Sequence, residues 1–377
     1  MQQLSAPTRD DIRFMARAIH LAERGLFTTD PNPRVGCVLV QEGQIVGEGW
    51  HRRVGGPHAE IEALCEAGAR AVGATAYVTL EPCCHHGKTP PCTEALIISR
   101  VSRVVAAMED PNPRVGGKGL AALRAAGIAT DCALLKEEAE ALNPGFCKRM
   151  RTGRPFIRSK LAMSLDGQTA LASGESRWIT GDAARRDAHR LRARSSAILT
   201  GVDTVVADDP SLTARLETGE DLLQPARIVV DSRLRTPTTA KLLRQTGSAI
   251  VVTTSKDQVR ILELTEAGAE IVTLESDLCS HRVDLHALGR YLADSEYNEI
   301  LVEAGAMLNG ALLQAGLVDE WVVYMAPCVL GTASRGLFDL IGIERMSDRY
   351  ELSITDVRQI GKDLRIRLLQ APSLKNG

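Results

Sequence analysis

The feature that most constrains this chain is a set of metal-binding side-chain types between residues 58 and 92. His58-Ala59-Glu60 comes first, Pro82-Cys83 follows, and Pro91-Cys92 completes the set. One His and two Cys can supply three ligands to zinc, and a catalytic zinc site keeps its fourth position open for water. The fold must therefore bring three separate stretches of the chain to one point.

The order His-x-Glu, Pro-Cys and a later Cys is typical of zinc-dependent base deaminases. Zinc lowers the pKa of a bound water, which then attacks the ring carbon that bears the amino group. We expect His58, Cys83 and Cys92 to be the ligands. Glu60 would not bind the metal but would carry protons from the water to a ring nitrogen and to the departing ammonia.

The spacing of the cysteines departs from the usual Pro-Cys-x-x-Cys of these deaminases. Cys84, His85 and His86 follow Cys83 directly and compete with it as ligands. We prefer Cys83 because it follows Pro82, as the pattern requires. Two alternatives are that these side chains are unrelated, or that they form a closed structural zinc site. A closed site would need a fourth protein ligand and would not need Glu60.

Around this motif, short apolar runs alternate with helical periodicity, which indicates a layered α/β domain. We predict strands at 35–40, 45–50, 76–80, 101–107 and 130–134, and helices at 8–25, from 58, at 93–99, 120–126 and 136–142. Asn143-Pro144-Gly145 breaks the pattern. The basic stretch 148–154 is predicted to be a solvated linker, with phosphate contact as the alternative. We therefore place a domain boundary between 147 and 148.

Residues 148–377 show the same alternation, so the second domain is also predicted to be α/β. Strands are expected at 156–161, 197–200, 227–230, 249–253, 270–274, 300–302 and 321–325, a helix at 182–194, and a closing hairpin of 352–357 and 364–369 around Gly361. The chain contains no Gly-x-Gly-x-x-Gly, so a Rossmann dinucleotide site is not supported.

The heptad Asp-Pro-Asn-Pro-Arg-Val-Gly occurs twice, at 30–36 and 110–116. The copies are either two similar turns or two loops beside a pocket, where Asn side chains both donate and accept hydrogen bonds. We favour a functional role for at least one copy and select Asn32 as a substrate-binding candidate. His51 is a second candidate for the pocket lining; a surface imidazole is the alternative.

Composition limits the possible partners. Lys and Arg number 45 against 47 Asp and Glu, and only 3% of residues are aromatic. This balance argues against a nucleic-acid or membrane partner. No apolar run reaches the roughly 18 residues of a membrane span, and no signal-peptide core is present. Nine cysteines, an odd number, suggest reduced thiols. We therefore expect a cytoplasmic enzyme with a small-molecule substrate.

Long stretches of the chain resemble the bifunctional deaminase/reductase family of riboflavin biosynthesis. The resemblance lies in 31–40, 49–60, 81–92, 160–167, 173–180, 198–213, 228–233 and 302–310, and it covers essentially the whole chain. It includes the long gap between Cys83 and Cys92. The resemblance implies a cytidine-deaminase-like α/β/α domain over 1–147 and a dihydrofolate-reductase-like α/β domain over 148–377.

The resemblance also implies two consecutive reactions. The first is deamination of 2,5-diamino-6-(ribosylamino)-4(3H)-pyrimidinone 5′-phosphate. The second is reduction of the ribosyl group by NADPH, which gives 5-amino-6-(5-phosphoribitylamino)uracil. Zinc would bind once per chain in the first domain and NADPH in the second. The partner would be a phosphorylated pyrimidine, and we expect a homo-oligomer. The alternatives are a zinc nucleoside or nucleic-acid deaminase with an unrelated C-terminal domain, and a non-enzymatic structural-zinc protein.

Individual reductase residues are implied by the same resemblance. Those for the nicotinamide cofactor are Ala162, Trp178, Thr204, Asp208, Ser232, Gly305, Ala306, Met307, Leu308, Asn309 and Gly310. Those for the substrate are Ser176, Arg192, Leu212, Arg215 and Glu303. Arg192 and Arg215 suit a phosphate because guanidinium groups pair bidentately with its oxygens. Their alternative role is a surface salt bridge; for Trp178 it is core packing and for Asp208 a helix cap. Lys160 could stabilise an opened ribosylamine or be solvated. His20, His189, His281 and His286 receive no role.

Overall fold

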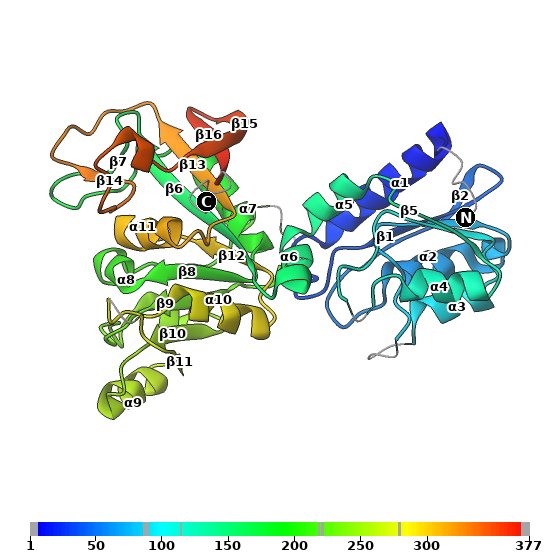
Figure 1. Ribbon diagram of the computed structural model, residues 1–377, viewed down its shortest axis with the longest axis horizontal. Helices are drawn as coiled ribbons and strands as arrows, with labels where there is room; N and C mark the ends of the chain where they lie inside the picture. Colours follow the sequence, from blue (N-terminus) through cyan, green and yellow to red (C-terminus); the bar gives the residue numbers. More distant parts are fainter. Residues whose placement is uncertain are drawn as a thin grey trace. The chain divides into compact units, whose positions relative to one another are not determined.

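A computed structural model describes residues 7–85, 90–113, 115–217, 219, 222–277 and 280–370. The chain forms two compact units, Met1–Gly153 and Arg154–Gly377 (Figure 1). The division comes later than the expected boundary at 147/148, because helix α6, Pro144–Thr152, runs through that point. Pro144 stands in the first turn of α6, where its missing N–H is not needed. The predicted linker at 148–154 is therefore wrong for most of its length.

The first unit contains a five-stranded sheet in the order β2-β1-β3-β4-β5. Its strands are β1 Gly36–Gln41, β2 Gln44–Trp50, β3 Thr75–Val78, β4 Arg103–Ala106 and β5 Ala129–Cys132. β1 is antiparallel to both neighbours, and the other pairs are parallel. Glu42 and Gly43 both have positive φ, 52° and 76°, which is the two-residue hairpin turn that the sequence predicts.

Helices cover both faces of this sheet. They are α1 Arg9–Ala22, α2 Ala59–Ala67, α3 Cys92–Ile98, α4 Lys118–Ala125, α5 Lys136–Leu142 and α6. Side chains alternate along a strand, so Cys37 and Leu39 of β1 enter one core with α2, α3 and α4. Val38 and Val40 enter the other core with α1, α5 and α6. This is the expected α/β/α layering.

The glycines of β2 allow helix α2 to lie directly on the sheet. A Cβ on Gly49 would stand 2.2 Å from the carbonyl oxygen of Ala59, and one on Gly47 would stand 2.2 Å from that of Ala63. Real Cβ atoms do not approach a backbone so closely, so any side chain would push the helix away. The two glycines therefore determine how closely α2, the helix that follows His58, packs on the sheet.

The second unit is built on a nine-stranded sheet in the order β11-β10-β9-β8-β12-β6-β13-β16-β15. These strands are β6 Phe156–Ser164, β8 Ala197–Gly201, β9 Ala226–Val230, β10 Ala249–Thr253, β11 Glu270–Thr273, β12 Glu299–Val302, β13 Glu320–Ala326, β15 Leu352–Ile360 and β16 Asp363–Gln370. From β11 to β13 all pairs are parallel, and β16 and β15 close the edge as the expected antiparallel hairpin. A small separate sheet pairs β7, Gln168–Ala170, with β14, Arg335–Gly336.

The helices of this unit connect parallel strands, as crossover connections require. They are α7 Asp182–Arg194, α8 Val202–Asp208, α9 Gln258–Glu266, α10 Leu285–Asp294 and α11 Ala306–Gln314. The largest core cluster includes Leu199, Ile300, Leu312 and Trp321. Ligands of open parallel sheets bind outside the carboxyl ends of the strands, which is where α8 and α11 begin (Figure 1).

Among the described residues, no helix combines the length and apolar character needed to cross a membrane.

Candidate functional site

Three metal-binding side chains meet in the first unit. His58 is the N-cap residue of α2, Cys92 is the first residue of α3, and Cys83 lies in the loop after β3. His58 Nδ1 lies 3.2 Å from the Cys92 sulfur and 3.6 Å from the Cys83 sulfur. All three donor atoms lie within 4.8 Å of one another. The packing of α2 and α3 on the sheet thus joins stretches that are distant in sequence.

The spacing of these donors fits zinc. Bond lengths of about 2.3 Å to sulfur and 2.1 Å to nitrogen at a tetrahedral angle place the donor atoms roughly 3.6 Å apart. The observed 3.2 and 3.6 Å separations are close to that value. In the described part of the chain, Cys84 and His85 do not belong to this group; His86 lies outside the described residues.

The two thiols share a hydrogen bond that lowers the pKa of Cys83 and raises that of Cys92, so Cys83 is the one that ionises first. Hydrogen bonding with Cys92 and His58 lowers the pKa of Cys83 to about 4, and the backbone N–H of Cys92 donates to the Cys83 sulfur at 3.3 Å. The thiolate is the form of cysteine that binds a metal. Of the two cysteines, only Cys92 begins a helix.

Glu60 lies in the first turn of α2, two residues after His58, and is 4% exposed. Burial raises the pKa of Glu60 to about 7, and the positive charge of His58 opposes that shift. A carboxyl group inside a closed site, beside the metal donors, can take up a proton and release it. Glu60, the expected proton carrier, thus lies beside the metal donors.

His51 and Asn32 form one unit beside the metal donors. The His51 and His58 rings pack edge to face, with centroids 5.6 Å apart. His51 Nδ1 lies 2.9 Å from the carbonyl of Pro57, which can only accept, so Nδ1 carries the proton. Nε2 then accepts from the Asn32 amide at 3.1 Å. Burial lowers the pKa of His51, which favours this neutral form. His51 is therefore not a surface imidazole.

Sequence reasoning assigned no role to Glu81, although Glu81 immediately precedes Pro82-Cys83. Its buried carboxylate accepts four backbone hydrogen bonds, from Asp110, Gly117, Gly119 and Leu120, at 2.8–3.1 Å. These donors lie in the second heptad region and at the start of α4. Glu81 therefore attaches the metal-binding loop to residues distant in the chain. The signal in the sequence was the position of Glu81, two residues before the expected metal ligand Cys83.

The two identical heptads have different surroundings. In the first copy, Asn32 reaches His51 and the Arg34 backbone exchanges hydrogen bonds with the side chain of Asn143. In the second, the Asp110 side chain accepts from the Asn112 N–H and the loop encloses the Glu81 carboxylate. Arg114 lies outside the described residues. Identical sequences thus have different partners, because a turn takes its partners from the elements around it; a functional role for at least one copy stays a prediction.

In the second unit, Arg192 of α7 and Glu303, which follows β12, form a two-point ion pair. Arg192 Nε and Nη2 donate to the two carboxylate oxygens at 2.5 and 2.8 Å. Nη1 donates to the carbonyl of Thr213 at 3.1 Å. Burial opposes ionisation of Glu303, but Arg192 lowers its pKa to about 2. All three nitrogens of the Arg192 guanidinium thus already donate hydrogen bonds within the protein, which limits its expected role in binding a phosphate.

Two further groups lie close to this pair. Lys160 of β6 is partly buried, with its ammonium 5.9 Å from the centroid of the Tyr324 ring. Burial lowers the pKa of Lys160 and Glu303 opposes that shift. His189, given no role above, has Nε2 3.4 Å from the Arg215 guanidinium. The only signal in the sequence for a role of His189 was its position one helical turn before Arg192.

The residues expected to hold the nicotinamide cofactor fall into two groups. Thr204 and Gly305 adjoin each other, since a Cβ on Gly305 would lie 4.0 Å from Thr204 Oγ1. The backbone N–H groups at the start of α11 suit a phosphate. Asn309, by contrast, is fully buried: it accepts from Ser159 and donates to the carbonyls of Ala304 and Gly305.

Gly310 also faces the protein. A Cβ there would stand 2.1 Å from the carbonyl oxygen of Asp339, so the glycine is required by packing. Asn309 and Gly310 therefore shape the turn, while Gly305, Ala306 and Met307 remain accessible. Ala162 and Leu308 are partly buried, on β6 and α11. Ser232 follows β9, and Asp208 ends α8, where its carbonyl accepts from Arg177.

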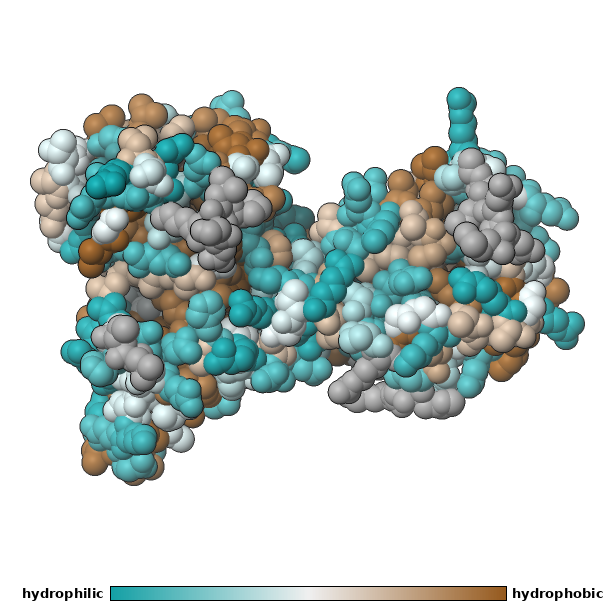
Figure 2. Space-filling model, viewed as in Figure 1, coloured by the Kyte–Doolittle hydropathy of each residue, from teal (hydrophilic) through white to brown (hydrophobic). Residues whose placement is uncertain are grey.

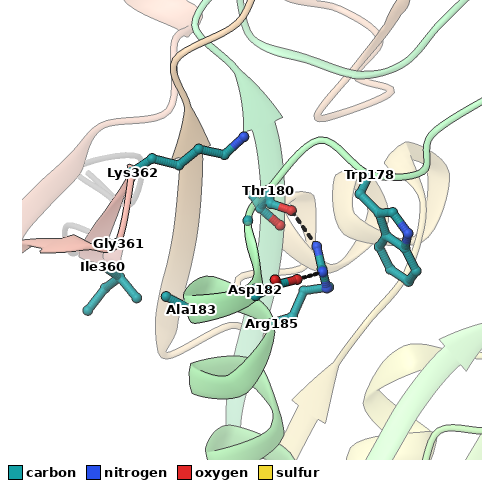
Figure 3. Close-up of a pocket in the computed structure, with 9 residues that line it drawn as sticks. Trp178, Thr180, Asp182, Ala183, Arg185, Ile360, Gly361 and Lys362 are labelled. Atoms are coloured by element: carbon teal, nitrogen blue, oxygen red, sulfur yellow. Dashed lines mark hydrogen bonds and ion pairs between the residues drawn. The ribbon is translucent and has the colours of Figure 1, made fainter.

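Trp178 is 70% exposed, which excludes core packing. It borders a cavity of about 470 Å³ whose other walls include the start of α7 and the turn between β15 and β16 (Figure 3). The Arg185 guanidinium lies 4.5 Å from the Trp178 ring centroid, and Arg185 also pairs with Asp182 and donates to the Thr180 carbonyl at 2.8 Å. The indole is thus available to a planar ligand.

The remaining substrate candidates differ in accessibility. Ser176 is partly buried and Arg215 is exposed. Leu212 is 3% exposed and packs with Leu191 and Tyr324. Its side chain therefore belongs to the core, and only its backbone could reach a ligand.

Comparison with known proteins matches two family models to the two units. Residues 8–108 match the cytidine and deoxycytidylate deaminase zinc-binding region, and residues 155–366 match the RibD C-terminal domain. The chain is 50% identical over 371 residues to riboflavin biosynthesis protein RibD of Escherichia coli strain K12, covering 96% of this chain and 100% of that protein.

Solved structures agree. Form 1 of RibD from Acinetobacter baumannii has a TM-score of 0.90 at 44% identity, covering 97% of this chain and 99% of that one. A diaminohydroxyphosphoribosylaminopyrimidine deaminase/5-amino-6-(5-phosphoribosylamino)uracil reductase from Thermotoga maritima has a TM-score of 0.84 at 32% identity, covering 96% and 99%. The predicted pairing of a deaminase fold with a reductase fold is confirmed.

Proposed function

We propose roles for individual residues of this chain, which belongs to the RibD family of bifunctional riboflavin-biosynthesis enzymes. It is a zinc-dependent deaminase and an NADPH-dependent reductase. It deaminates the phosphorylated diaminopyrimidinone and then reduces the ribosyl group to ribityl. A nucleic-acid or nucleoside deaminase with an unrelated C-terminal domain is not favoured, because residues 155–366 match the reductase of this family.

The observation that carries the deaminase assignment is the meeting of His58, Cys83 and Cys92 beside the buried Glu60. The three side chains would hold zinc, which when bound supplies a water acidic enough to attack the ring. Glu60 would accept a proton at its carboxylate and deliver it first to a ring nitrogen and then to the leaving amino group. His51, neutral and fixed by Pro57, would orient Asn32 towards the substrate.

In the reductase unit, Glu303 would remain ionised and accept hydrogen bonds from substrate hydroxyl groups, while Arg192 keeps it in place. Arg215 and the remaining donors of Arg192 would bind the phosphate. Ala162 and Trp178 would border the nicotinamide, and the start of α11 would bind the cofactor phosphates. Ser176 and the backbone of Leu212 would complete the substrate contacts, and Thr204, Asp208 and Ser232 those of the cofactor.

The two activities can be tested separately on the intact protein. Removal of zinc by a chelator should stop ammonia release from the diaminopyrimidinone phosphate. NADPH oxidation should continue when the deaminated intermediate is supplied, because the reductase residues lie in the other unit. Loss of both activities would contradict the proposal of two independent sites, and restoring zinc to the stripped protein is the control.

We also propose that the enzyme is a homo-oligomer. β15 is the edge strand of the large sheet, and Ile354, Val357 and Leu369 on this hairpin are 63%, 53% and 43% exposed. Hydrophobic side chains gather over β15 and β16 in the space-filling view (Figure 2). An exposed edge with apolar side chains favours pairing. Ile354→Glu should lower the mass measured by sedimentation, whereas Ser353→Glu should leave it unchanged.

The cytoplasm is the location that we propose. The cysteines found in the described ranges are free thiols, as expected in a reducing compartment. Cell fractionation followed by immunodetection tests this location directly.

A further inference from the structure

Cys83 has the least support from secondary structure among the three expected zinc ligands. His58 caps α2 and Cys92 begins α3, so helices that pack on the sheet fix both positions. Cys83 instead lies in the loop after β3. A metal ligand in a loop must be oriented by hydrogen bonds from its surroundings, and the described residues on both sides of Cys83 provide them.

Thr93 holds the Cys83 backbone from one side. The Cys83 carbonyl accepts hydrogen bonds from the N–H and from Oγ1 of Thr93, both at 3.2 Å. Thr93 is buried and directly follows Cys92 in the first turn of α3. One residue therefore connects the loop ligand to the helix that carries the next ligand.

Glu81 holds the same loop from the other side, and its side chain is buried. Each of its carboxylate oxygens accepts two backbone N–H groups; the donors are Asp110 and Gly117 for Oε2, and Gly119 and Leu120 for Oε1. Because all four partners are donors, an amide NH₂ in place of either oxygen would face two N–H groups. The surroundings of this side chain therefore require a carboxylate.

The contact between this loop and α4 leaves no space for adjustment. A Cβ on Gly119 would stand 2.1 Å from the Pro82 carbonyl oxygen, so the start of α4 lies directly against the peptide that joins Pro82 to Cys83. Interiors packed this closely transmit small displacements. Any shift of the Glu81 carboxylate relative to α4 therefore moves the backbone of the ligand.

The second heptad, 110–116, supplies part of the surroundings of Glu81. The Asp110 carboxylate accepts from the Asn112 N–H at 2.8 Å, and the Asn112 carbonyl accepts from two later N–H groups of the same turn, both at 2.9 Å. The turn thereby brings the N–H groups of Asp110 and Gly117 to one oxygen of Glu81, at 3.0 and 2.8 Å. The heptad thus supports the metal-binding loop, although none of its described side chains belongs to the donor group.

We propose that Glu81 is a positioning residue of the deaminase: together with Thr93 it places Cys83 for zinc before the metal binds, and the second heptad keeps Glu81 in place. Zinc then binds to a site whose three donors already lie together, and little binding free energy is lost in ordering the loop. Residues that orient a metal ligand typically contribute about 10- to 100-fold to the affinity for the metal. The inference rests on the proposed ligand assignment.

Zinc affinity tests the proposal without turnover. Zinc is removed from the full chain, and its dissociation constant is then measured by competition with a chromophoric chelator. Glu81→Gln should raise this constant about 10- to 100-fold, because the amide faces two N–H groups and the loop shifts. The metal-free variant should keep the wild-type circular-dichroism spectrum, which a general loss of structure in the first unit would change.

Glu109→Gln is the matched control, because Glu109 is an exposed carboxylate beside Asp110; it should keep the wild-type zinc constant. Thr93→Val removes one neutral hydrogen bond to Cys83 and should weaken zinc binding about 2- to 10-fold, and Thr93→Ser should restore it. This pair decides the case in which Glu81→Gln does not fold. Unchanged zinc constants in Glu81→Gln and Thr93→Val would overturn the proposal. Wild-type protein that binds no zinc would overturn the ligand assignment instead.

Discussion

Two glutamates, one in each unit, have pKa values that their surroundings shift in opposite directions. Glu60 lies at the start of α2 and burial raises its pKa to about 7. Glu303 is partly buried, with 14% of its side chain exposed, and Arg192 lowers its pKa to about 2 although burial opposes that shift. Burial alone favours the neutral acid, and a guanidinium at hydrogen-bonding distance reverses that preference. One carboxyl group is therefore suited to moving a proton and the other to remaining a fixed anion.

The same contrast extends to the way each site is assembled. The deaminase donors all lie within 35 residues, 58–92, and their chemistry is dictated by residue type. The reductase residues come from strands, helices and loops spread between 160 and 310, and none has a role that residue type alone dictates. Substitutions in the deaminase site and in the reductase site can test this difference.

The largest effect is expected at the metal. Cys83→Ser should reduce zinc from about one ion per chain to nearly none and abolish ammonia release, because one of three ligands is lost. Cys84→Ser should retain zinc, since Cys84 is outside the donor group. Elemental analysis of both purified variants decides this, and zinc loss only in Cys84→Ser would reverse the ligand assignment.

Glu60→Gln should come next. The amide cannot carry a proton, so the deamination rate should fall about 10²- to 10⁴-fold, with zinc content and reduction of the deaminated intermediate unchanged. Glu62→Gln, on the same helix but paired with Arg52 at the surface, is the control. Ammonia release and NADPH oxidation are measured separately. A normal deamination rate in Glu60→Gln would remove the distinction drawn between the two glutamates.

Glu303→Gln should act on stability as well as reduction. It leaves the Arg192 charge without its partner, which should destabilise the second unit by roughly 2–4 kcal/mol, somewhat less than in a fully enclosed pair because the side chains are 18% and 14% exposed. Asp203→Asn, which breaks the exposed pair with Arg235, should cost less than about 1 kcal/mol. Denaturant unfolding of both variants measures the difference.

Lowering the pH should have the smallest effect, because it removes only the stabilisation that the ionised Glu303 gives to the second unit. Because the folded pKa of Glu303, about 2, lies below its ordinary value of 4.5, its stabilisation is complete above about pH 5.5. It is then lost as pH falls from about 4.5 towards 2. The shift corresponds to at most about 3 kcal/mol. Between pH 6 and 3, the free energy of unfolding should fall more steeply with decreasing pH in wild type than in Glu303→Gln. Identical slopes would show that Arg192 does not hold Glu303 ionised.

The sequence predicted most strands and helices because apolar periodicity is a local property. His58, Cys83 and Cys92 could be predicted for a similar reason: zinc accepts few residue types, in few arrangements. The errors concern contacts over long sequence distances. Whether Asn309 faces a ligand depends on Ser159, and whether Gly310 is open depends on Asp339. Neither partner can be inferred from neighbouring residues.

α6 was missed for another reason. Asn143-Pro144-Gly145 is normally a break, but Pro also begins helices, and the buried side of α6, which includes Cys147, packs on α1 side chains such as Phe14 in the same core. Membership of this shared core, rather than the local sequence, therefore accompanies the helical conformation of these residues.

The carboxylate of Glu81 links the metal-binding loop to four backbone amides elsewhere in the chain, so hydrogen exchange at those amides reports whether the loop is intact. The amide protons of Asp110, Gly117, Gly119 and Leu120 all end on this one side chain. They can exchange with solvent deuterium only when Glu81 leaves its place. Those four amides should therefore exchange as one cooperative group and report loosening of the Pro82-Cys83 loop before the rest of the unit unfolds.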